Sequence, residues 1–237
     1  MILEHLGWDS AHFKIRIGKI DLYGVERSQL NDTIVQMNRK GFDLIYLFAP
    51  VYLQDLTDDL LGYENRKDTK VVYSKLLLED ISMPPDILIP DQLSLAERDR
   101  VIRLGLASGI FSRFKLDDRL TPGRFEEMYK IWTEKAIDSQ DGNHLALYKE
   151  GESILGVITY KVKLHVVEVG LLSVDPACGG KGIGSKLLRW VEYFALQNGL
   201  STINIPTQAT NLPACKFYDK NGYIITDLVN VYHIWNI

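Results

Sequence analysis

The chain has 237 residues, 46% of them hydrophobic, enough for one large domain or two small ones with a sizeable core. Its 27 basic and 31 acidic residues give a net charge of -4 without a block of one sign, so we expect neither a nucleic-acid nor a membrane partner. The first residues lack the basic region followed by an apolar region that is typical of a signal peptide. No apolar run approaches the roughly 18 residues of a membrane span. We therefore expect a soluble, cytoplasmic protein.

The N-terminal third alternates strand and helix patterns. An amphipathic helix is expected at residues 26–39. Strands are expected at residues 16–22, 43–49 and 69–79. A proline-rich segment follows, and we place a linker near residues 82–94. The sequence thus predicts an α/β fold with a small N-terminal domain over residues 1–90 and a second domain over residues 91–237.

The sequence of the second domain predicts helices first, then a run of strands, and then alternating helices and strands. Thr121 and Pro122 have the pattern of an N-cap followed by proline at the first helical position. Helices are expected at residues 94–109, 122–138, from the glycine cluster to about 198, and 211–222. Strands are expected at residues 144–150, 153–163, 166–174 and 201–207, followed by a β-rich tail.

The segment SVDPACGGKGIGSKLL, residues 173–188, has four glycines within six positions between a strand and a helix pattern. The glycines are Gly179, Gly180, Gly182 and Gly184. They leave main-chain N–H groups unshielded at a helix N-terminus, where the helix dipole favours negative charge. Such a turn can hold a pyrophosphate, with Lys181 at its rim. The alternative is a flexible turn that caps an ordinary core helix.

Spacing separates three kinds of phosphate-binding loop. A P-loop needs Ser or Thr after its lysine, whereas Gly182 follows Lys181. A dinucleotide-binding fold needs an acidic residue at the end of the next strand, which here ends in Pro206 and Thr207. The remaining pattern is an acyl-CoA loop. The stretch VGLLSVDPACGGKGIGSKLL resembles the acetyl-CoA motif of the GNAT acyltransferases, although Gly179 stands where that motif usually has Gln or Arg.

The segment ATNLPACKFYDKNGY resembles the second cofactor element of the same family, with an Asn at the start of a short helix and a Tyr toward its end. The resemblance implies a GNAT fold, a mixed central sheet with flanking helices, with acetyl-CoA as cosubstrate and no metal. Ten residues are expected to bind the cofactor: Leu172, Ser173, Val174, Gly179, Gly180, Lys181, Gly182, Ile183, Gly184 and Asn211.

Two residues are candidates for proton transfer. Tyr218 corresponds to the family's acid for the departing thiolate, and a phenol is protonated at neutral pH. The alternative is a tyrosine that serves core packing. Strand periodicity places Glu168 on one face with Gly170, Leu172 and Val174, which makes Glu168 a candidate base, acting directly or through water. Its alternative is a solvated strand residue. Gly170 also leaves room for another backbone to approach or for a bulge, so that main-chain donors near Leu172 to Val174 could bond the pantetheine arm and the acetyl carbonyl.

The whole chain further resembles bacterial TDP-fucosamine acetyltransferases, through LGWDSAHFKIRIGKI, GIFSRFKLDDRL and YKIWTEKAI in addition to the motifs above. This resemblance implies a nucleotide-linked amino-dideoxyhexose as acceptor, and the GNAT family implies a homodimer paired through tail strands. Four residues are candidates for acceptor binding: Arg113, Phe114, Asp117 and Arg119. The alternative for this segment is a solvated charged loop packed by phenylalanines.

Two other functions fit the same motifs. One is a GNAT enzyme for another primary amine, such as a protein N-terminus or a small metabolite. The other is a non-catalytic acyl-CoA sensor. The presence of both Asn211 and Tyr218 argues for catalysis over sensing.

Overall fold

The computed structural model describes residues 3–32, 41–78 and 81–236. Its strands form a single sheet in the order β1-β2-β3-β10-β4-β9-β8-β7-β6-β5. The bounds of these strands are Glu4–His5 (β1), Ile17–Asp21 (β2), Leu44–Pro50 (β3), Arg66–Leu76 (β4), Ile87–Leu88 (β5), Asn143–Glu150 (β6), Ser153–Lys163 (β7), Val166–Val174 (β8), Thr202–Gln208 (β9) and Ile224–Trp235 (β10).

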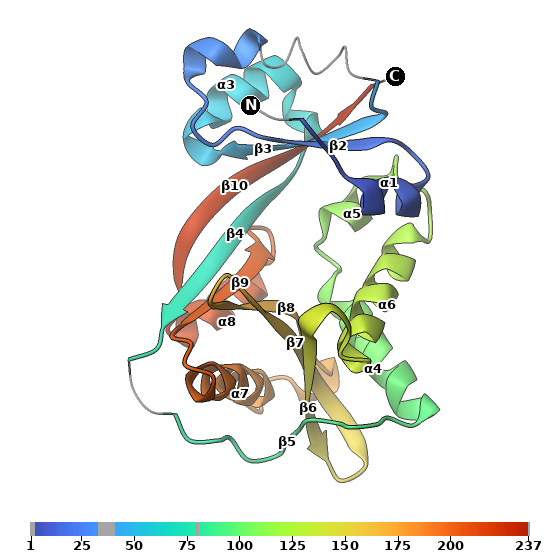
Figure 1. Cartoon of the computed structure of the whole chain (residues 1–237), viewed down its shortest axis with the longest axis vertical. Helices are drawn as coiled ribbons and strands as arrows, with labels where there is room; N and C mark the ends of the chain where they lie inside the picture. The colour runs from blue at the N-terminus through green and yellow to red at the C-terminus, as the bar shows by residue number, and fades with distance from the viewer. Residues whose placement is uncertain (1–2, 33–40, 79–80, 237) are drawn as a thin grey trace.

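The sheet is mixed. Strand β2 pairs with β3 in parallel and β8 with β9 in parallel, whereas the other neighbours are antiparallel. Strand β10 lies between β3 and β4 and thereby joins the N-terminal strands to the rest (Figure 1). The predicted N-terminal α/β unit is therefore part of one continuous sheet among the described residues. The division at residue 90 stays a prediction.

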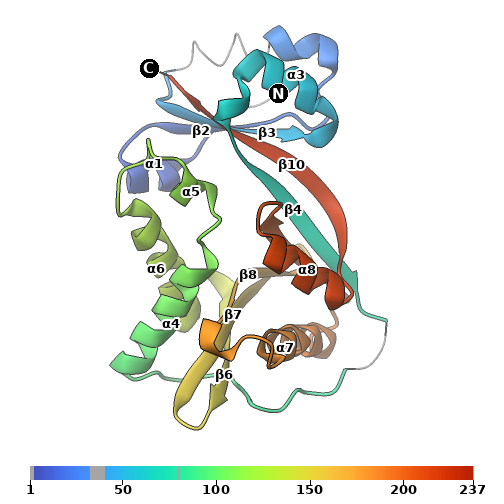
Figure 2. The ribbon, with the colours of Figure 1, turned by 180° about the vertical axis from the view of Figure 1, so that it is seen from behind.

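The helices are α1 (Gly7–Phe13), α3 (Gln54–Leu61), α4 (Leu95–Ser108), α5 (Arg113–Leu116), α6 (Arg124–Ile137), α7 (Ile183–Gln197) and α8 (Leu212–Lys220). Alternate residues of β6 pack into different clusters, because successive side chains of a strand point to opposite faces. Ala146 belongs to the cluster of α7, whereas Leu145 and Leu147 belong to the cluster of α4 and α6. Helices α7 and α8 lie side by side, away from α4 and α6 (Figure 2).

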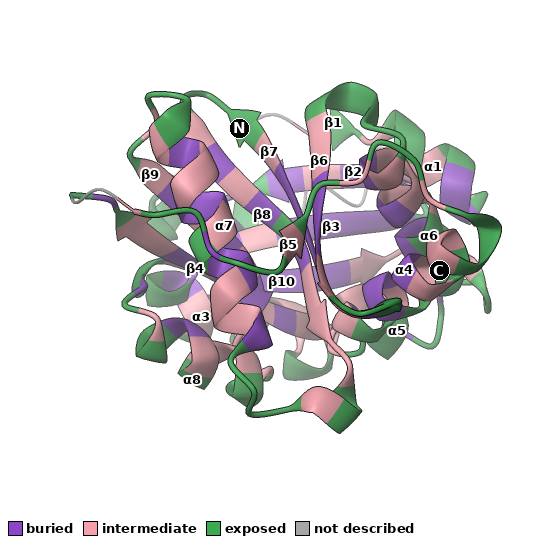
Figure 3. Ribbon diagram, turned by 90° about the horizontal axis from the view of Figure 1, so that it is seen from below, coloured by how far each residue is buried: buried purple, intermediate pink, exposed green. Residues whose placement is uncertain are grey.

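A third apolar cluster ties the two ends of the chain together. It packs Phe125 and Met128 of α6 against Leu44 and Tyr46 of β3, and it includes Leu171 of β8. Figure 3 shows the buried residues along the strands and on the inner sides of the helices. The N-terminal strands therefore share a core with the helices that flank β6–β8.

One local prediction needs correction. Helix α6 begins at Arg124 with Gly123 as its N-cap at φ 80°, so Thr121 and Pro122 lie outside it. Glycine tolerates this left-handed conformation, which explains why the helix begins there. Of the helix expected at 26–39, Arg27–Gln29 is a 3-10 turn and residues 30–32 are helical, and the rest of the prediction lies outside the described residues. The sequence did not predict α1, α3, or strand β5 inside the expected linker.

A buried hydrogen-bonded pair joins the end of α5 to β10. The Asp117 carboxylate accepts hydrogen bonds from His233 Nδ1 at 2.6 Å and from Trp235 Nε1 at 3.0 Å. Burial would raise the pKa of Asp117, but the hydrogen bonds from His233 and Trp235 outweigh it and lower that pKa. Burial lowers the pKa of His233 to about 4, although Asp117 opposes the shift.

This pair predicts acid sensitivity. Because the pKa of His233 falls from 6.5 to about 4 on folding, unfolded chains bind more protons in that interval. The resulting stability, on the order of 3 kcal/mol, is present above pH 6.5 and is lost as the pH falls toward 4. The free energy of unfolding, measured with urea, should thus fall more steeply between pH 6.5 and 4 for the wild type than for His233→Gln. Parallel profiles would contradict the assignment.

Candidate active site

Strands β8 and β9 separate after a short stretch of parallel pairing. The paired residues are Val167 with Ile203 and Glu168 with Asn204, and no later residue of β8 pairs with β9. On its other side β8 stays paired with β7 as far as Val174. In an antiparallel pair, alternate residues turn their N–H groups away from the partner. The end of β8 therefore presents main-chain donors to the gap left by β9.

A bulge at Gly170 and Leu171 sets the direction of this strand end. The register shifts there, with both residues opposite Thr159 of β7. The Leu171 N–H donates to Thr159 Oγ1 at 2.9 Å, and a Cβ on Gly170 would lie 2.8 Å from that oxygen. The predicted bulge at Gly170 is thus confirmed.

The bulge also reverses which face later residues occupy. Leu172 and Val174 pack against the same apolar cluster as Val167 and Val169, so they lie on the face opposite Glu168. The expectation that Glu168 shares a face with Leu172 and Val174 is therefore wrong, because the bulge inserts one extra residue into the alternation.

The glycine loop lies directly beyond β8. Asp175 leaves the strand and its carboxylate accepts from the Ala177 N–H at 2.8 Å and from the Arg100 guanidinium of α4. Gly180 and Gly182 have φ angles of 79° and 74°, and a Cβ at either would meet nothing within 4 Å. Gly182 is the N-cap of α7 and no side chain caps that helix. Its first N–H groups are thus available to an anion.

Helix α7 is held close to the sheet. A Cβ on Gly156 of β7 would lie 2.8 Å from Ile183 and 3.0 Å from Leu187, so glycine permits this approach. A Cβ on Gly184 would lie 3.0 Å from the ring of Phe217, which brings α8 against the start of α7. The loop is therefore fixed between β7 and α8.

A first cavity, of about 430 Å³, opens between the loop, α8 and the C-terminal end of α4. We call it the loop pocket. Nine of the ten residues expected to bind cofactor line it, together with Tyr218; Lys181 does not. Phe217 also lines it, and so do four residues at and just after the end of α4: Ala107, Ser108, Ile110 and Phe111.

Two residues of α8 differ in their surroundings. Asn211 is the N-cap of α8, and its Oδ1 accepts from the Ala214 N–H at 3.3 Å, which leaves its amide NH2 free to donate. Tyr218 is 6% exposed, and its ring lies 5.4 Å from that of Tyr73. Burial raises the pKa of Tyr218 above 10, so its phenol stays protonated at neutral pH.

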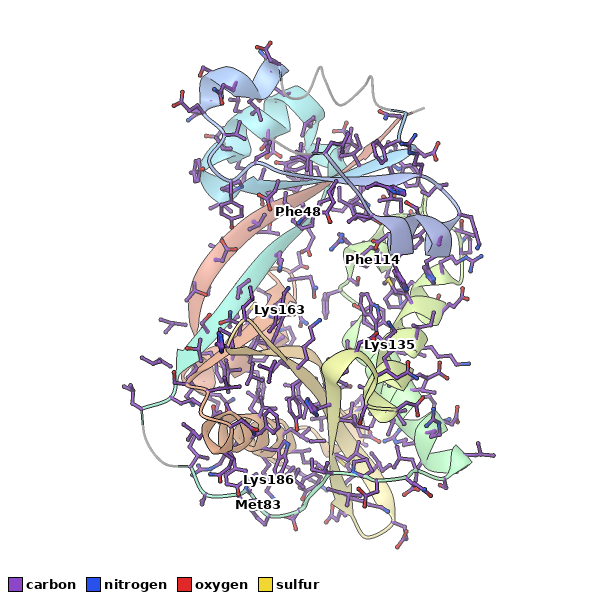
Figure 4. The ribbon with its side chains drawn as sticks, viewed as in Figure 1. Phe48, Met83, Phe114, Lys135, Lys163 and Lys186 are labelled. Atoms are coloured by element: carbon purple, nitrogen blue, oxygen red, sulfur yellow. The ribbon has the colours of Figure 1, made fainter. Side chains whose placement is uncertain are left out.

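A second cavity, of about 600 Å³, lies between α5, α6 and strands β4 and β7–β9. We call it the acceptor-side pocket. Phe48, Phe114 and Lys135 reach it from β3, α5 and α6, and Figure 4 labels all three. Glu168 and Arg113 also line it. Consecutive residues line the two pockets at two places: Leu171 and Ser112 line the acceptor-side pocket, whereas Leu172 and Phe111 line the loop pocket.

The four expected acceptor residues separate into two pairs. Arg113 and Phe114 line the acceptor-side pocket, with the guanidinium 4.1 Å from the Phe114 ring centre. Asp117 is 3% exposed and engaged by His233 and Trp235, and Arg119 lies over the Trp235 ring at 5.1 Å. Neither Asp117 nor Arg119 lines a described pocket, so we assign them to the junction of α5 with β10 instead.

Sequence reasoning missed other residues of the acceptor-side pocket. Asp68 and Lys70 of β4 line it, and so does Trp132 of α6. Strand periodicity puts Asp68 and Lys70 on one face of β4, but the strand also carries Arg66, Lys67 and Lys75, so no local pattern singled these two out. The described residues contain no group of three or more His, Cys, Asp or Glu placed to bind a metal ion. Within those residues, no helix is long and apolar enough to cross a membrane.

Comparison with known proteins agrees with this geometry. Residues 111–223 match the model of the acetyltransferase (GNAT) family. A GCN5-related N-acetyltransferase from Sphaerobacter thermophilus superposes with a TM-score of 0.62 at 14% identity, over 92% of this chain and 72% of that one. Residues 111–223 therefore match the GNAT acetyltransferase family, and the chain has an α/β GNAT fold.

Two curated relatives match shorter stretches. The uncharacterized protein YdhI of Bacillus subtilis (strain 168) is 36% identical over 86 residues, 36% of this chain and 51% of its own length. The aminoalkylphosphonate N-acetyltransferase of Salmonella typhimurium is 30% identical over 86 residues, 34% of this chain and 56% of its own length. The chain thus spans about half the length of these relatives.

The bulge gives a stability prediction. Thr159→Val should leave the Leu171 N–H buried without a partner and cost about 1–2 kcal/mol of unfolding free energy. Thr159→Ser keeps the hydroxyl and should retain most of that stability. Urea unfolding measures both, and a Val variant as stable as the wild type would show that the hydroxyl does not support the bulge.

Proposed function

We propose that this protein is an N-acetyltransferase that uses acetyl-CoA and transfers the acetyl group directly to a primary amine. The observation that carries the proposal is the loop pocket, where the glycine loop, the end of β8 and Tyr218 line one cavity. These residues fit the cosubstrate, because unshielded N–H groups at the start of α7 suit a pyrophosphate. Acetyl-CoA supplies the acyl group as a thioester.

The protein's residues then have distinct parts. Main-chain N–H groups of Leu172–Val174 hold the thioester carbonyl oxygen, where negative charge develops during attack. The N–H groups around Gly179–Gly184 bind the pyrophosphate, with Lys181 adding charge from the rim. Asn211 donates its free amide NH2 to the cosubstrate while its carbonyl caps α8. No covalent enzyme intermediate is needed.

Proton transfer uses two residues, Glu168 in the acceptor-side pocket and Tyr218 in the loop pocket. As the new C–N bond forms and the C–S bond breaks, Glu168 takes the proton of the amine, directly or through water. Tyr218 Oη gives its proton to the departing sulfur. The position of Glu168, in the last pair between β8 and β9 and in the wall of the acceptor-side pocket, supports its part as base.

For the acceptor we propose a dTDP-linked amino-dideoxyhexose, used in cell-surface polysaccharide precursor synthesis. The size of the acceptor-side pocket and the presence there of Arg113 and Phe114 support an extended, anionic and partly aromatic acceptor. The match to an aminoalkylphosphonate N-acetyltransferase favours a second candidate, a small primary amine that carries an anion. We further propose a cytoplasmic homodimer.

The acid assignment predicts a selective defect. Tyr218→Phe should lower kcat about 100-fold or more, with little change in the affinity for acetyl-CoA, because only the proton donor is removed. Tyr223→Phe is the matched control, since it also deletes a buried phenol, one that donates to Glu192 at 3.1 Å. Unchanged turnover of Tyr218→Phe across the pH range would rule out the acid role.

The acceptor assignment is tested with a panel of amines. Thiol release from acetyl-CoA should be most efficient, by kcat/KM, with a dTDP-4-amino-4,6-dideoxyhexose. Aminoalkylphosphonates, polyamines and peptides with free N-termini serve as competitors. Activity on peptides alone would overturn the sugar assignment, and binding of acetyl-CoA without turnover of any amine would favour the sensor.

A further inference from the structure

The acceptor-side pocket contains a primary amine that belongs to the protein itself. Lys70 of β4 lines this pocket, and its side chain is neither fully buried nor fully exposed. Within the described residues, no ion pair or hydrogen bond engages Lys70 Nζ. By contrast, Lys135 Nζ in the same pocket pairs with Asp141 at 2.7 Å. Lys70 therefore brings an unused amine into the pocket proposed for an amine acceptor.

Strand register places Lys70 level with the end of β8. Lys70 pairs with Gln208 of β9, and Asn204 of β9 pairs with Glu168 of β8. Gln208 lies four residues beyond Asn204, and β8 runs parallel to β9. Once the residue inserted by the bulge is counted, Gln208 is level with Leu172–Ser173. Lys70 is thus level with the main-chain donors proposed to hold the thioester carbonyl.

Lys70 shares a face of the sheet with Glu168. Directly opposite residues of neighbouring strands put their side chains on one face, and alternate residues of a strand return to it. Lys70, Gln208 and Glu168 accordingly all line the acceptor-side pocket. Only β9 lies between β4 and β8, so two strand spacings of about 4.8 Å separate Lys70 from the line of β8. The gap proposed for the thioester lies nearer, between β8 and β9, and the flexible four-carbon side chain of lysine reaches across one strand.

Other lysines on this side of the sheet lie farther from the end of β8. Lys161 of β7 pairs with Glu168 and Lys163 pairs with Val166, so both lie before the bulge. Lys163, which Figure 4 labels, also forms an ion pair with Glu168, with 4.0 Å between Nζ and Oε2. Among the lysines described for this side of the sheet, Lys70 therefore lies level with the thioester.

The surroundings of Lys70 favour its neutral form. Burial lowers the pKa of Lys70, and this effect outweighs the Glu168 carboxylate, which raises it. The positive charge of Arg113 lowers the pKa further. A larger share of Lys70 is thus neutral at neutral pH than of an exposed lysine. The neutral amine is the form that attacks a carbonyl carbon.

We propose that Lys70 is a site of self-acetylation, at which acetyl-CoA bound in the loop pocket acetylates Lys70 Nζ of the same chain. The nitrogen lone pair of Lys70 forms the new N–C bond and the C–S bond breaks. Glu168 takes the proton that the nitrogen loses, and CoA leaves as a thiol with the proton of Tyr218. The products are N-acetyl-lysine and CoA, and exchange with water restores both proton-transfer groups. The inference rests on the proposed function, because it uses the same acyl donor.

Self-acetylation requires an acceptor-side pocket without acceptor. An acceptor amine held beside Glu168 competes with Lys70 for the same thioester, so a bound acceptor should protect Lys70. Acetylation also removes the positive charge of the lysine. The modified pocket therefore has one cation fewer for an anionic acceptor.

Mass spectrometry of the intact full chain, incubated with acetyl-CoA and no amine, tests the proposal. One acetyl group should appear per chain, at a rate constant independent of protein concentration, and peptide mapping should place it on Lys70. Lys70→Arg should slow this first acetylation about tenfold or more, because a positioned amine reacts faster than amines at the surface. Lys67→Arg is the matched control from the same strand. Lys67 Nζ donates to the Glu64 carbonyl at 2.9 Å, and this variant should react like the wild type.

Two controls separate enzymatic transfer from chemical acetylation and from misfolding. In the wild-type chain unfolded in urea, Lys70 should react no faster than the other lysines. Calorimetry should show that Lys70→Arg binds acetyl-CoA like the wild type. Equal rates at Lys70 and at exposed lysines of the folded chain, or an unchanged first acetylation in Lys70→Arg, would overturn the proposal.

The outcomes also distinguish this site from the proposed function. If free amines are acetylated while Lys70 stays unmodified, the proposed function stands and the self-acetylation site is wrong. If Lys70 of the folded chain is acetylated while no free amine is turned over, the site stands and transfer to a free acceptor fails. A wild-type chain that does not bind acetyl-CoA would contradict both.

Discussion

The separation of β8 from β9 is the constraint on which the rest of the site depends. Parallel pairing stops at Glu168 and Asn204. The bulge, which Thr159 supports with a hydrogen bond, reverses the faces on which the side chains after Leu171 lie. Main-chain donors that would otherwise be used in a ladder become available at the edge. Consecutive residues of this strand, Leu171 and Leu172, line the two pockets, one in each.

The N-terminal strands contribute to function through the sheet. Strand β10 pairs with both β3 and β4, and β3 and β4 supply Phe48 and Asp68 to the acceptor-side pocket. The pair of Asp117 with His233 holds α5 against β10, so that neighbouring Arg113 and Phe114 face this pocket. The acceptor-side pocket is therefore lined by residues from Phe48 to Gln208, whereas the loop pocket is lined only by residues after position 106.

The sequence was most informative where function depends on the main chain. Glycine spacing predicted the loop before α7, because glycine readily adopts the positive φ angles found at Gly180 and Gly182. Side-chain placement depended on long-range register, which no local pattern carries. Strict alternation put Glu168 on the face of Leu172, and one inserted residue reversed it. Asp117 was likewise predicted to bind the acceptor, but β10 places His233 against its carboxylate. Asp68, far upstream in sequence, could join the site only through the order of the strands.

The central claim is that main-chain groups at the start of α7 bind the diphosphate of acetyl-CoA, and calorimetry on two matched glycine variants tests it most directly. Gly182 and Gly199 have similar positive φ angles, 74° and 69°, with nothing within 4 Å of an added Cβ, but they lie at opposite ends of α7. Alanine should cost about 1 kcal/mol of stability at either position. The account predicts that the wild type and Gly199→Ala bind acetyl-CoA alike and that Gly182→Ala binds it at least tenfold more weakly. Absence of wild-type binding, or equal affinity in both variants, would contradict it.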